Sequence, residues 1–320
     1  MHSPQTQFDM VLIGNYTKDT IVSPAGTRVV DGGGFNYGAC AASRLELKLA
    51  AVTRLAAEDS HVVDGLERLG IHVFPRFTPK STHLRLEYPS ADTDERTIFV
   101  TSSAGSFTPE DIVGLSARAF TIHASMRGEV EPDVIRAIRK RGGMVVADAQ
   151  GFVRVQDPAG RLVCAPWPEK REVLSLIHIL KADSLESEML TGEKDLRAAA
   201  RLLASLGPRE IVLTHRGGLV VYAAGTFYEA PFLPARLLGR SGRGDTCIAS
   251  YVARRLNASP SEATVWAAAL TSLKMEAEGP FRRDIREVED LIRRKYIGSK
   301  RSPPKESPAE DTREQKTKMV

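Results

Sequence analysis

Short apolar runs rich in Val and Ile recur along the chain, and segments with the spacing of amphipathic helices separate them. A run of this kind without polar alternation is typical of a strand that is buried on both faces of a sheet. The runs are residues 8–13, 144–147, 211–213 and 219–222. Because strands alternate with helices, the pattern predicts a mostly parallel sheet with helices on both sides.

Three segments have helical patterns with recognisable ends. Residues 35–50 are rich in Ala and Leu, and residues 59–69 follow a Glu-Asp-Ser start and stop at Gly70. Residues 131–141 carry Pro132 in the first turn and Gly142 after the last one. Proline at the start and glycine past the end are the usual boundaries of a helix, so we expect a helix in each segment.

Two segments break the alternation. Residues 20–31 and 82–100 interleave polar and apolar positions, the second around a turn-rich PSADTD. This pattern predicts a small antiparallel flap, or lid, beside the main sheet.

Residues 299–320 contain almost nothing apolar and are rich in Pro, Lys, Glu and Ser. Such a segment cannot bury enough surface to order itself, so we expect one domain over 1–298 and a disordered tail.

Composition and charge exclude several classes of protein. The 44 basic residues exceed the 40 acidic ones by four and are spread along the chain, so nucleic acid is not a favoured partner. No apolar run approaches the roughly 18 residues of a membrane span, and the start MHSPQTQFDM has no basic stretch followed by an apolar one. We therefore expect a cytoplasmic protein without a membrane partner. The three cysteines lack metal or redox spacing.

Two glycine-rich stretches could bind an anion at a helix N-terminus, where unpaired amides and the helix dipole favour negative charge. The first, DGGGFNYGAC (31–40), has Tyr37 where the dinucleotide fingerprint needs its third glycine, which disfavours a Rossmann-type oxidoreductase. The second, SGRGDTCIASY (241–251), lacks the Lys and Ser/Thr of a P-loop. Its Asp245 is either a helix N-cap or a catalytic base, and this stretch alone leaves both open.

Further motifs, in the same chain order, make the sequence resemble the ribokinase-type (PfkB) carbohydrate kinases. SGRGDT resembles that family's TGAGDT signature, and KADSLESEMLTG (181–192) resembles its segment near magnesium and phosphates. LTHRGG (213–218) is similar to the strand and turn that line the nucleotide, and GNYTKD (14–19) with DGGGFNYGA to the elements that hold the sugar. Gly14-Asn-Tyr and the glycine pair before an aromatic are similar to the inositol-kinase branch. The chain departs from the family at Gly239, Arg243 and Asp183, where relatives usually carry Asp, Ala and Asn.

The resemblance implies a ribokinase-like three-layer αβα sandwich with a mostly parallel sheet and a small β-strand lid. It implies ATP-dependent phosphorylation of a hydroxyl on a small polyol, with ATP and Mg²⁺ as cofactors. Myo-inositol is the first acceptor to consider, and a sugar or a nucleoside is the second. A non-catalytic sugar or nucleotide sensor on the same fold is a further alternative, which the presence of Asp245 disfavours. A homodimer through the lid is the assembly that such flaps suggest.

The resemblance also assigns roles to residues of this chain. Asp245 would be the general base, and the amides of Gly242, Arg243 and Gly244 would face the transferring phosphoryl group. Acceptor binding falls to Asp19, Asn15, Gly32, Gly33 and Tyr37, and donor binding to Lys181, Thr214, Arg216 and Gly217. Asp183 and Glu186 would hold magnesium through waters, or they form an ordinary helix start. His61, His72, His123, His178 and His215 share no metal spacing, and we interpret them as structural or surface residues.

Overall fold

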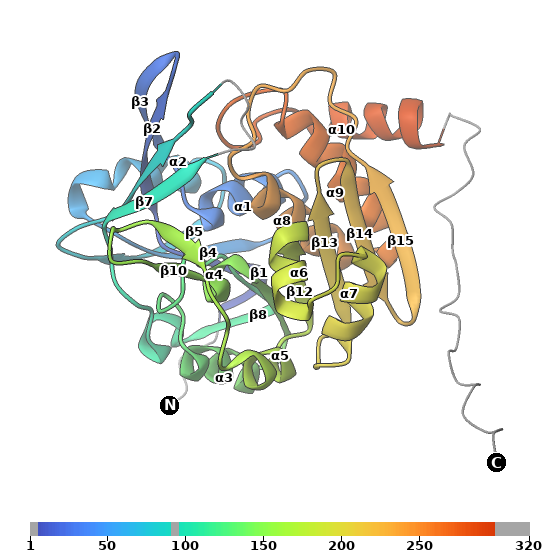
Figure 1. Ribbon diagram of the computed structural model, residues 1–320, viewed down its shortest axis with the longest axis horizontal. Helices are drawn as coiled ribbons and strands as arrows, with labels where there is room; N and C mark the ends of the chain where they lie inside the picture. Colours follow the sequence, from blue (N-terminus) through green and yellow to red (C-terminus); the bar gives the residue numbers. More distant parts are fainter. Residues whose placement is uncertain (1–5, 91–95, 298–320) are drawn as a thin grey trace.

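A nine-stranded sheet runs through the centre of the protein, whose computed structural model describes residues 6–90 and 96–297 (Figure 1). Seven strands are parallel to one another, and β14 and β15 close one edge in antiparallel pairing. In spatial order the strands are β15 (Thr226–Pro231), β14 (Gly218–Ala223), β13 (Glu210–His215), β12 (Ile179–Asp183), β9 (Met144–Asp148), β8 (Leu115–Ile122), β1 (Thr6–Ile13), β4 (Leu49–Leu55) and β5 (His72–Phe77).

Helices cover both faces of this sheet, because successive side chains of a strand point to opposite sides. On β1, Val11 and Ile13 belong to one buried cluster, whereas Met10 and Leu12 belong to the other. The first cluster contains residues of α3 (Pro132–Lys140), α5 (Lys170–Leu176), α6 (Ser184–Thr191) and α7 (Leu196–Ala204). The second contains residues of α1 (Gly34–Ala42), α2 (His61–Glu67), α8 (Arg243–Arg255) and α9 (Pro260–Lys274), with α10 (Ile285–Leu291) packed outside them. The predicted three-layer αβα sandwich is confirmed.

The two segments that broke the alternation form a separate four-stranded sheet, in the order β3-β2-β6-β7. Its strands are β2 (Thr17–Ser23), β3 (Gly26–Asp31), β6 (Thr82–Glu87) and β7 (Thr97–Ser102). The pairs β2–β3 and β6–β7 are antiparallel, as expected, whereas β2 and β6 between them are parallel. We call this sheet the lid. Residues 91–95, within the turn predicted between β6 and β7, lie outside the described residues, as does the predicted disordered tail.

The remaining short elements connect these layers. They are α4 (Gln150–Val153), the paired strands β10 (Arg154–Gln156) and β11 (Leu162–Cys164), the 3₁₀ turns η1 (Ala57–Asp59) and η2 (Pro109–Ile112), and the π-helical turn η3 (Ile292–Ile297). Of the helices that the structure describes, none combines the length and the apolar character needed to cross a membrane.

The helix predicted over 35–50 is wrong in its second half. The helix α1 ends at Ala42, and residues 49–55 form β4, which is almost entirely buried between β1 and β5. An apolar run inside a parallel sheet cannot be distinguished from a buried helix by periodicity alone. The helices predicted over 59–69 and 131–141 are confirmed as η1 with α2 and as α3.

The carboxyl ends of the parallel strands bring polar residues from distant segments to one edge of the sheet. β8 is followed by His123, β9 ends at Asp148 and β12 ends at Asp183. The lid begins at the same edge, because β2 starts four residues after the end of β1. Ligands of open α/β sheets bind at this edge, so the functional site is expected there.

Candidate active site

The turn before α8 presents backbone amides to the edge of the sheet. Gly242 is the N-cap of the helix and has a φ of 71°, which favours glycine, and no side chain caps the first turn. A Cβ on Gly242 would meet the ring of Tyr37, and one on Gly244 would lie 2.8 Å from Lys181 Nζ. Glycine is therefore required at Gly242, whereas a side chain at Gly244 would have to displace the Lys181 ammonium. The amide of Arg243 donates to the carbonyl of Arg240 at 3.1 Å, but among the described residues the amides of Gly244 and Asp245 have no acceptor, so they are available to an anion.

Asp245 is not the N-cap that one interpretation of the sequence proposed, because it occupies the third position of the helix. Its Oδ1 instead lies 3.4 Å from His123 Nδ1 and 3.4 Å from Gln150 Nε2. Burial raises the pKa of this carboxyl, but the hydrogen bond and charge of His123 and the charges of Lys181 and Arg154 outweigh it. The net pKa lies below the ordinary 3.8, so Asp245 is an ionised carboxylate at neutral pH.

On one side of Asp245 lies a small pocket between the sheet edge and the lid, which we call the acceptor pocket. Asp19 of β2 is 8% exposed, and its Oδ1 has no hydrogen-bond partner among the described residues. Desolvation, opposed by Thr17 and Arg96 and reinforced by Asp245, raises the pKa of Asp19 to about 6. A buried acceptor without a donor is costly in an empty pocket, and a ligand hydroxyl would satisfy it.

The other predicted acceptor residues divide into those that line this pocket and those that support it. Gly33 and Tyr37 are among the lining residues. Gly32 is not, but a Cβ there would collide with Asp19 and Thr17, so its glycine keeps Asp19 in place. Asn15 does not line the pocket either; it is fully buried, and its Nδ2 donates to the carbonyl of Gly105 at 3.0 Å. This contact holds the loop at Gly105, and it leaves the buried Oδ1 of Asn15 without a partner among the described residues.

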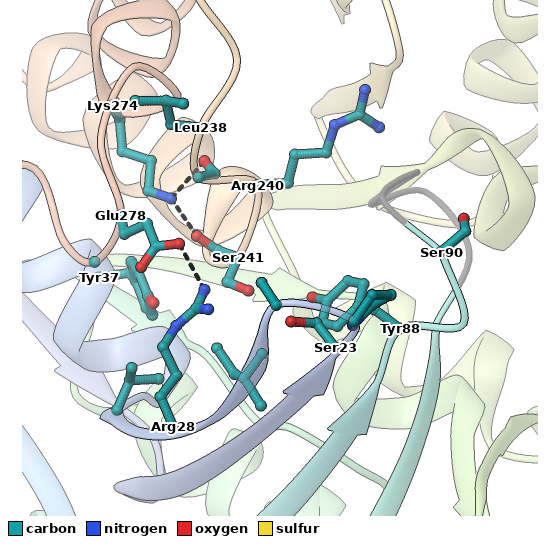
Figure 2. A pocket seen from close by; sticks show the side chains of 16 residues that line it. Ser23, Arg28, Tyr37, Tyr88, Ser90, Leu238, Arg240, Ser241, Lys274 and Glu278 are labelled. Atoms are coloured by element: carbon teal, nitrogen blue, oxygen red, sulfur yellow. Dashed lines mark hydrogen bonds and ion pairs between the residues drawn. The ribbon is translucent and has the colours of Figure 1, made fainter.

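A second hollow lies on the far side of Tyr37, between the lid hairpin and the loop before α8 (Figure 2). Tyr37 and Ser241 line both this hollow and the acceptor pocket. Lys274, at the end of α9, reaches into it, and Arg28 of the lid pairs with Glu278 across it at 2.5 Å. The Tyr37 ring therefore forms the wall between the two spaces.

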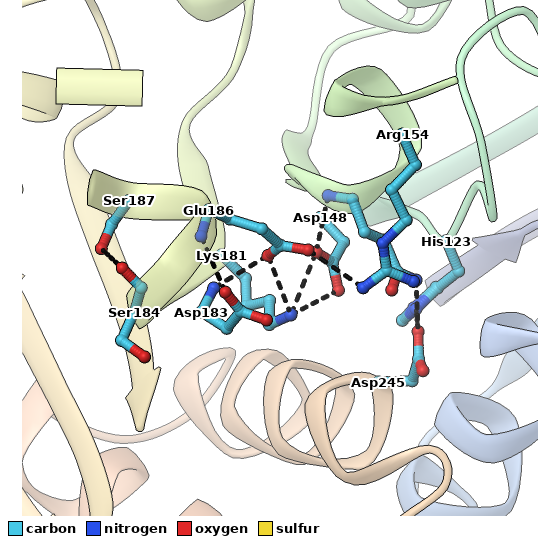
Figure 3. A network of polar contacts seen from close by, with 10 residues as sticks. His123, Asp148, Arg154, Lys181, Asp183, Ser184, Glu186, Ser187 and Asp245 are labelled. Carbon is cyan, nitrogen blue, oxygen red and sulfur yellow. Dashed lines mark hydrogen bonds and ion pairs between the residues drawn. The ribbon is translucent and has the colours of Figure 1, made fainter. Parts of the chain in front are cut away.

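On the other side of Asp245 lies a larger cavity of about 550 Å³, which we call the donor cavity. A network of buried charges forms its floor (Figure 3). Lys181 Nζ donates to Asp148 Oδ1 at 3.1 Å and lies 3.7 Å from Glu186, while Arg154 pairs with Glu186 at 3.1 Å. Burial lowers the pKa of Lys181, but the two carboxylates raise it further and leave it above its ordinary value.

Cations outnumber carboxylates around the donor cavity. Of the described residues that line it, six are cationic (Arg96, Arg154, Lys181, Arg216, Arg240 and Arg243) and three are acidic (Asp183, Glu186 and Asp245). Within the described chain, the Arg243 guanidinium forms no ion pair or hydrogen bond, and burial followed by the charge of Arg240 lowers its pKa. A partly buried cation without a counterion indicates a cavity built for an anion.

The two predicted magnesium ligands, Asp183 and Glu186, differ in how many of their oxygens are already engaged. Asp183 Oδ1 accepts from the amide of Glu186 at 2.8 Å, and Glu186 Oε2 accepts from the amide of Asp183 at 2.9 Å. This capping box realises the alternative of an ordinary helix start, and the other oxygen of Glu186 is bound to Arg154. Asp183 Oδ2 has no partner within the described residues, and one carboxylate with donor phosphates and waters suffices for Mg²⁺. No cage of three His, Cys, Asp or Glu side chains occurs in the described ranges.

The structure thus gathers most of the predicted residues around Asp245. Thr214 and Arg216 line the donor cavity, whereas Gly217 lies in the next turn, where its amide is bound to His215. Sequence reasoning missed Gln150 and Arg154, which line both spaces. It also treated His123 as structural or on the surface, although the side chain is buried against Asp245.

No family model matches the chain. A curated cytidine kinase of Thermococcus kodakarensis is 26% identical over 271 residues, which cover 80% of this chain and 92% of that protein.

Solved structures give stronger matches. A pyrophosphate-dependent kinase in the ribokinase family, complexed with a pyrophosphate analogue and myo-inositol, is 35% identical, with a TM-score of 0.81. The match covers 88% of this chain and 99% of that one. A pyrophosphate-dependent myo-inositol-1 kinase, the subject of a conversion into a myo-inositol-3 kinase, is 34% identical with a TM-score of 0.80, over 90% and 99% of the two chains. Ribokinase of Arabidopsis thaliana, complexed with ribose and ATP, shares the fold at 19% identity and a TM-score of 0.71, over 90% and 99%.

Proposed function

Since the chain belongs to the ribokinase family of kinases, we propose that it transfers a phosphoryl group from pyrophosphate to a hydroxyl of a small polyol. Myo-inositol is the first candidate for the acceptor. The observation that carries the proposal is the position of Asp245, which lines the donor cavity and the acceptor pocket at once. A single carboxylate is thus within reach of groups bound on both sides.

The chemistry follows from this position. The acceptor oxygen attacks the terminal phosphorus of the donor, a new O–P bond forms, and the bond from phosphorus to the leaving oxygen breaks. The hydroxyl proton passes to the Asp245 carboxylate, which is ionised at neutral pH. The leaving group departs as inorganic phosphate, or as ADP if the donor is ATP. Magnesium bound with the donor would neutralise phosphate charge.

The residues around the donor cavity hold charge rather than perform covalent work. Arg243, Arg154 and Lys181 surround the space next to the first turn of α8, whose amides also favour an anion. Lys181 keeps its proton because Asp148 and Glu186 stabilise the ammonium. The negative charge that moves to the leaving oxygen during transfer is then stabilised by cations that are positioned before the reaction.

For the donor, the proposal differs from the ATP that the sequence resemblance implied. Two relatives near 35% identity are described as pyrophosphate-dependent. The donor cavity itself supports this choice, because none of its described lining residues is aromatic and six are cationic. A nucleobase is usually held by apolar and aromatic side chains, whereas pyrophosphate requires only cations and amides. ATP is the alternative donor.

For the acceptor, the orphaned Asp19 oxygen favours a ligand with several hydroxyls. The lid adds the apolar side chains of Leu84, Leu86 and Ile98 above it. A cyclic polyol presents hydroxyls at its rim and C–H groups on its faces, which suits this combination. Sugars and nucleosides remain alternatives, the latter because of the cytidine kinase relative.

The proposal is tested with the purified protein, magnesium and a matrix of two donors and four acceptors. Pyrophosphate and ATP are each combined with myo-inositol, ribose, fructose and cytidine, and the phosphorylated acceptor is detected by ³¹P NMR. We expect product from pyrophosphate with myo-inositol, and none when the acceptor is omitted. Product that forms with ATP but not with pyrophosphate would overturn the assignment of the donor. Product that forms with ribose, fructose or cytidine but not with myo-inositol would overturn the assignment of the acceptor. If no combination gives product, a non-catalytic sensor is favoured.

A further inference from the structure

A second buried lysine lies beside the site and forms no ion pair with a carboxylate of the described residues. Lys274, the last residue of α9, is 2% exposed, and none of its ion pairs within the described residues involves Asp or Glu. Its ammonium donates instead to two backbone carbonyls, those of Gly239 at 3.0 Å and Ser241 (Figure 2). Burial of an ammonium is costly unless its donors are satisfied, and these two hydrogen bonds offset part of that cost.

The two carbonyls belong to the loop that leads into the anion-binding turn. This loop is also held by the carbonyl of Met275, which accepts from the amides of Leu238 and Gly239. The next residue after Ser241 is Gly242, which has a positive φ and is the N-cap of α8. Lys274 therefore ties the C-terminal end of α9, where the helix dipole favours a cation, to the start of α8.

The ammonium also contacts the wall of the acceptor pocket. Lys274 Nζ lies 5.2 Å from the centre of the Tyr37 ring, within the range of a cation–π interaction. The same ring packs so closely on Gly242 that a Cβ there would collide with it. Lys274, Tyr37 and Gly242 thus form a continuous stack from the end of α9 to the first amides of α8.

We propose that Lys274 is a positioning residue for phosphoryl transfer, whose ammonium holds the turn before Gly242 in the conformation that binds the transferring phosphate. This inference rests on the proposed function and adds a residue to it. Lys274 does not touch the reacting atoms in this arrangement. It acts through the carbonyls of Gly239 and Ser241, and its positive charge is the property that those carbonyls require.

The charge of Lys274 is sensitive to alkaline pH. Burial lowers the pKa of Lys274 to about 8; Asp245 and Glu278 raise it, and Arg243 and Arg96 lower it. Arg28, which is paired with Glu278, and Arg240 are the other cations among the described residues that line this hollow. Above pH 8 the amine would be neutral and would no longer donate to both carbonyls with full strength.

The first test compares Lys274→Met with the parent enzyme. We expect kcat to fall about 100-fold, the loss typical of a misplaced anion-binding amide, while KM for myo-inositol stays unchanged. Because Met removes a buried cation without a carboxylate partner, the thermal midpoint at pH 7 should not fall. Lys274→Arg, which keeps a cation, should recover part of the lost kcat, and Lys140→Met, at an exposed position of α3, should match the parent. An unchanged kcat in Lys274→Met overturns the proposal.

The pH profile distinguishes positioning from a purely structural role. The parent should lose kcat as pH rises above 8, and Lys274→Met should lack that step. The contribution of Lys274 to stability changes in the opposite direction. The pKa of Lys274 in the folded protein is lower than the 10.5 of the unfolded chain, so the unfolded chain binds more protons between pH 8 and 10.5. Lys274 therefore makes folding more favourable as the pH rises through this range. Loss of activity in this range is therefore not unfolding caused by Lys274. A parent profile that is flat to pH 9.5 contradicts the proposal.

A binding measurement separates this proposal from the proposed function and does not depend on a folded variant. Lysine residues labelled with ¹³C at Cε are titrated by NMR in the parent protein with and without pyrophosphate. An anion bound at the turn should raise the pKa of Lys274. If no donor and acceptor pair is turned over, the proposed function fails, yet a raised pKa with pyrophosphate still supports the role of Lys274 at the turn. A titration that pyrophosphate leaves unchanged overturns it.

Discussion

The donor cavity and the acceptor pocket meet at Asp245 but differ in how they treat charge. Around the donor cavity, six described cations face three carboxylates, and Arg243 has no counterion among the described residues. In the acceptor pocket two carboxylates, Asp19 and Asp245, face Arg96 and Arg154, and Asp19 keeps an oxygen without a donor. The charges of the donor cavity thus favour a polyanion, and those of the acceptor pocket favour neutral hydroxyls. Substitutions on the two sides should therefore affect different kinetic constants.

The largest effect is expected where the two sides meet. Asp245→Asn keeps the shape of the side chain but removes the base, so kcat should fall by about 10²–10⁴. Binding of pyrophosphate, measured by calorimetry, should be retained. Asp64→Asn, at an exposed position of α2, serves as the matched control and should leave kcat unchanged. Normal turnover by Asp245→Asn would remove the base from the mechanism and leave the two sides without a common reacting group.

On the donor side, Arg243→Gln should raise KM for pyrophosphate about 10- to 100-fold, since a hydrogen bond to a charged group contributes roughly 1.5–3 kcal/mol. KM for the acceptor should stay the same. Arg171→Gln, at an exposed position of α5, is the matched control. Equal changes in both constants would show that Arg243 does not belong to one side alone.

On the acceptor side, Asp19→Asn should raise KM for myo-inositol about tenfold, because one strong acceptor is replaced by a weaker one. KM for pyrophosphate should not change. The pair Arg243→Gln and Asp19→Asn forms a crossed test, measured by initial rates with each substrate varied in turn. A rise in the donor constant of Asp19→Asn would contradict the division into two sides.

The smallest effect is a pH dependence of acceptor binding. With the pKa of Asp19 raised by burial to about 6, its carboxylate is mostly protonated at pH 5, and KM for myo-inositol should be roughly fivefold higher at pH 5 than at pH 7. A raised carboxyl pKa makes the folded chain bind protons more strongly than the unfolded one between pH 6 and 3.8, so this group does not promote acid unfolding there. Asp19→Asn should lose the step; if it keeps the step, another group is responsible.

Features that depend on a continuous stretch of sequence were predicted well. SGRGDT carries Gly242 and Asp245 in one continuous turn, and the αβ alternation fixed the class of fold. His123 and Gln150 reach Asp245 from the ends of β8 and β9, over sequence separations of 122 and 95 residues. No spacing rule connects such positions, because only the order of strands in the sheet brings them together. Lys274 was missed for a similar reason: a lysine in a helix is normally solvated, and its buried partners are carbonyls.

The connection of the lid to the rest of the chain has a mechanical consequence. The hairpin of β2 and β3 leaves the main sheet after β1 and returns directly into the glycines before α1, and the amide of Gly32 donates to the carbonyl of Thr17 at 2.7 Å. The two ends of the hairpin are thus joined at a fixed pivot, and Asp19 is only two residues beyond it. If the hairpin tilts, its tip sweeps the widest arc while Asp19 hardly moves. A displacement of the hairpin tip over the acceptor pocket would therefore leave the Asp19 carboxylate close to its position.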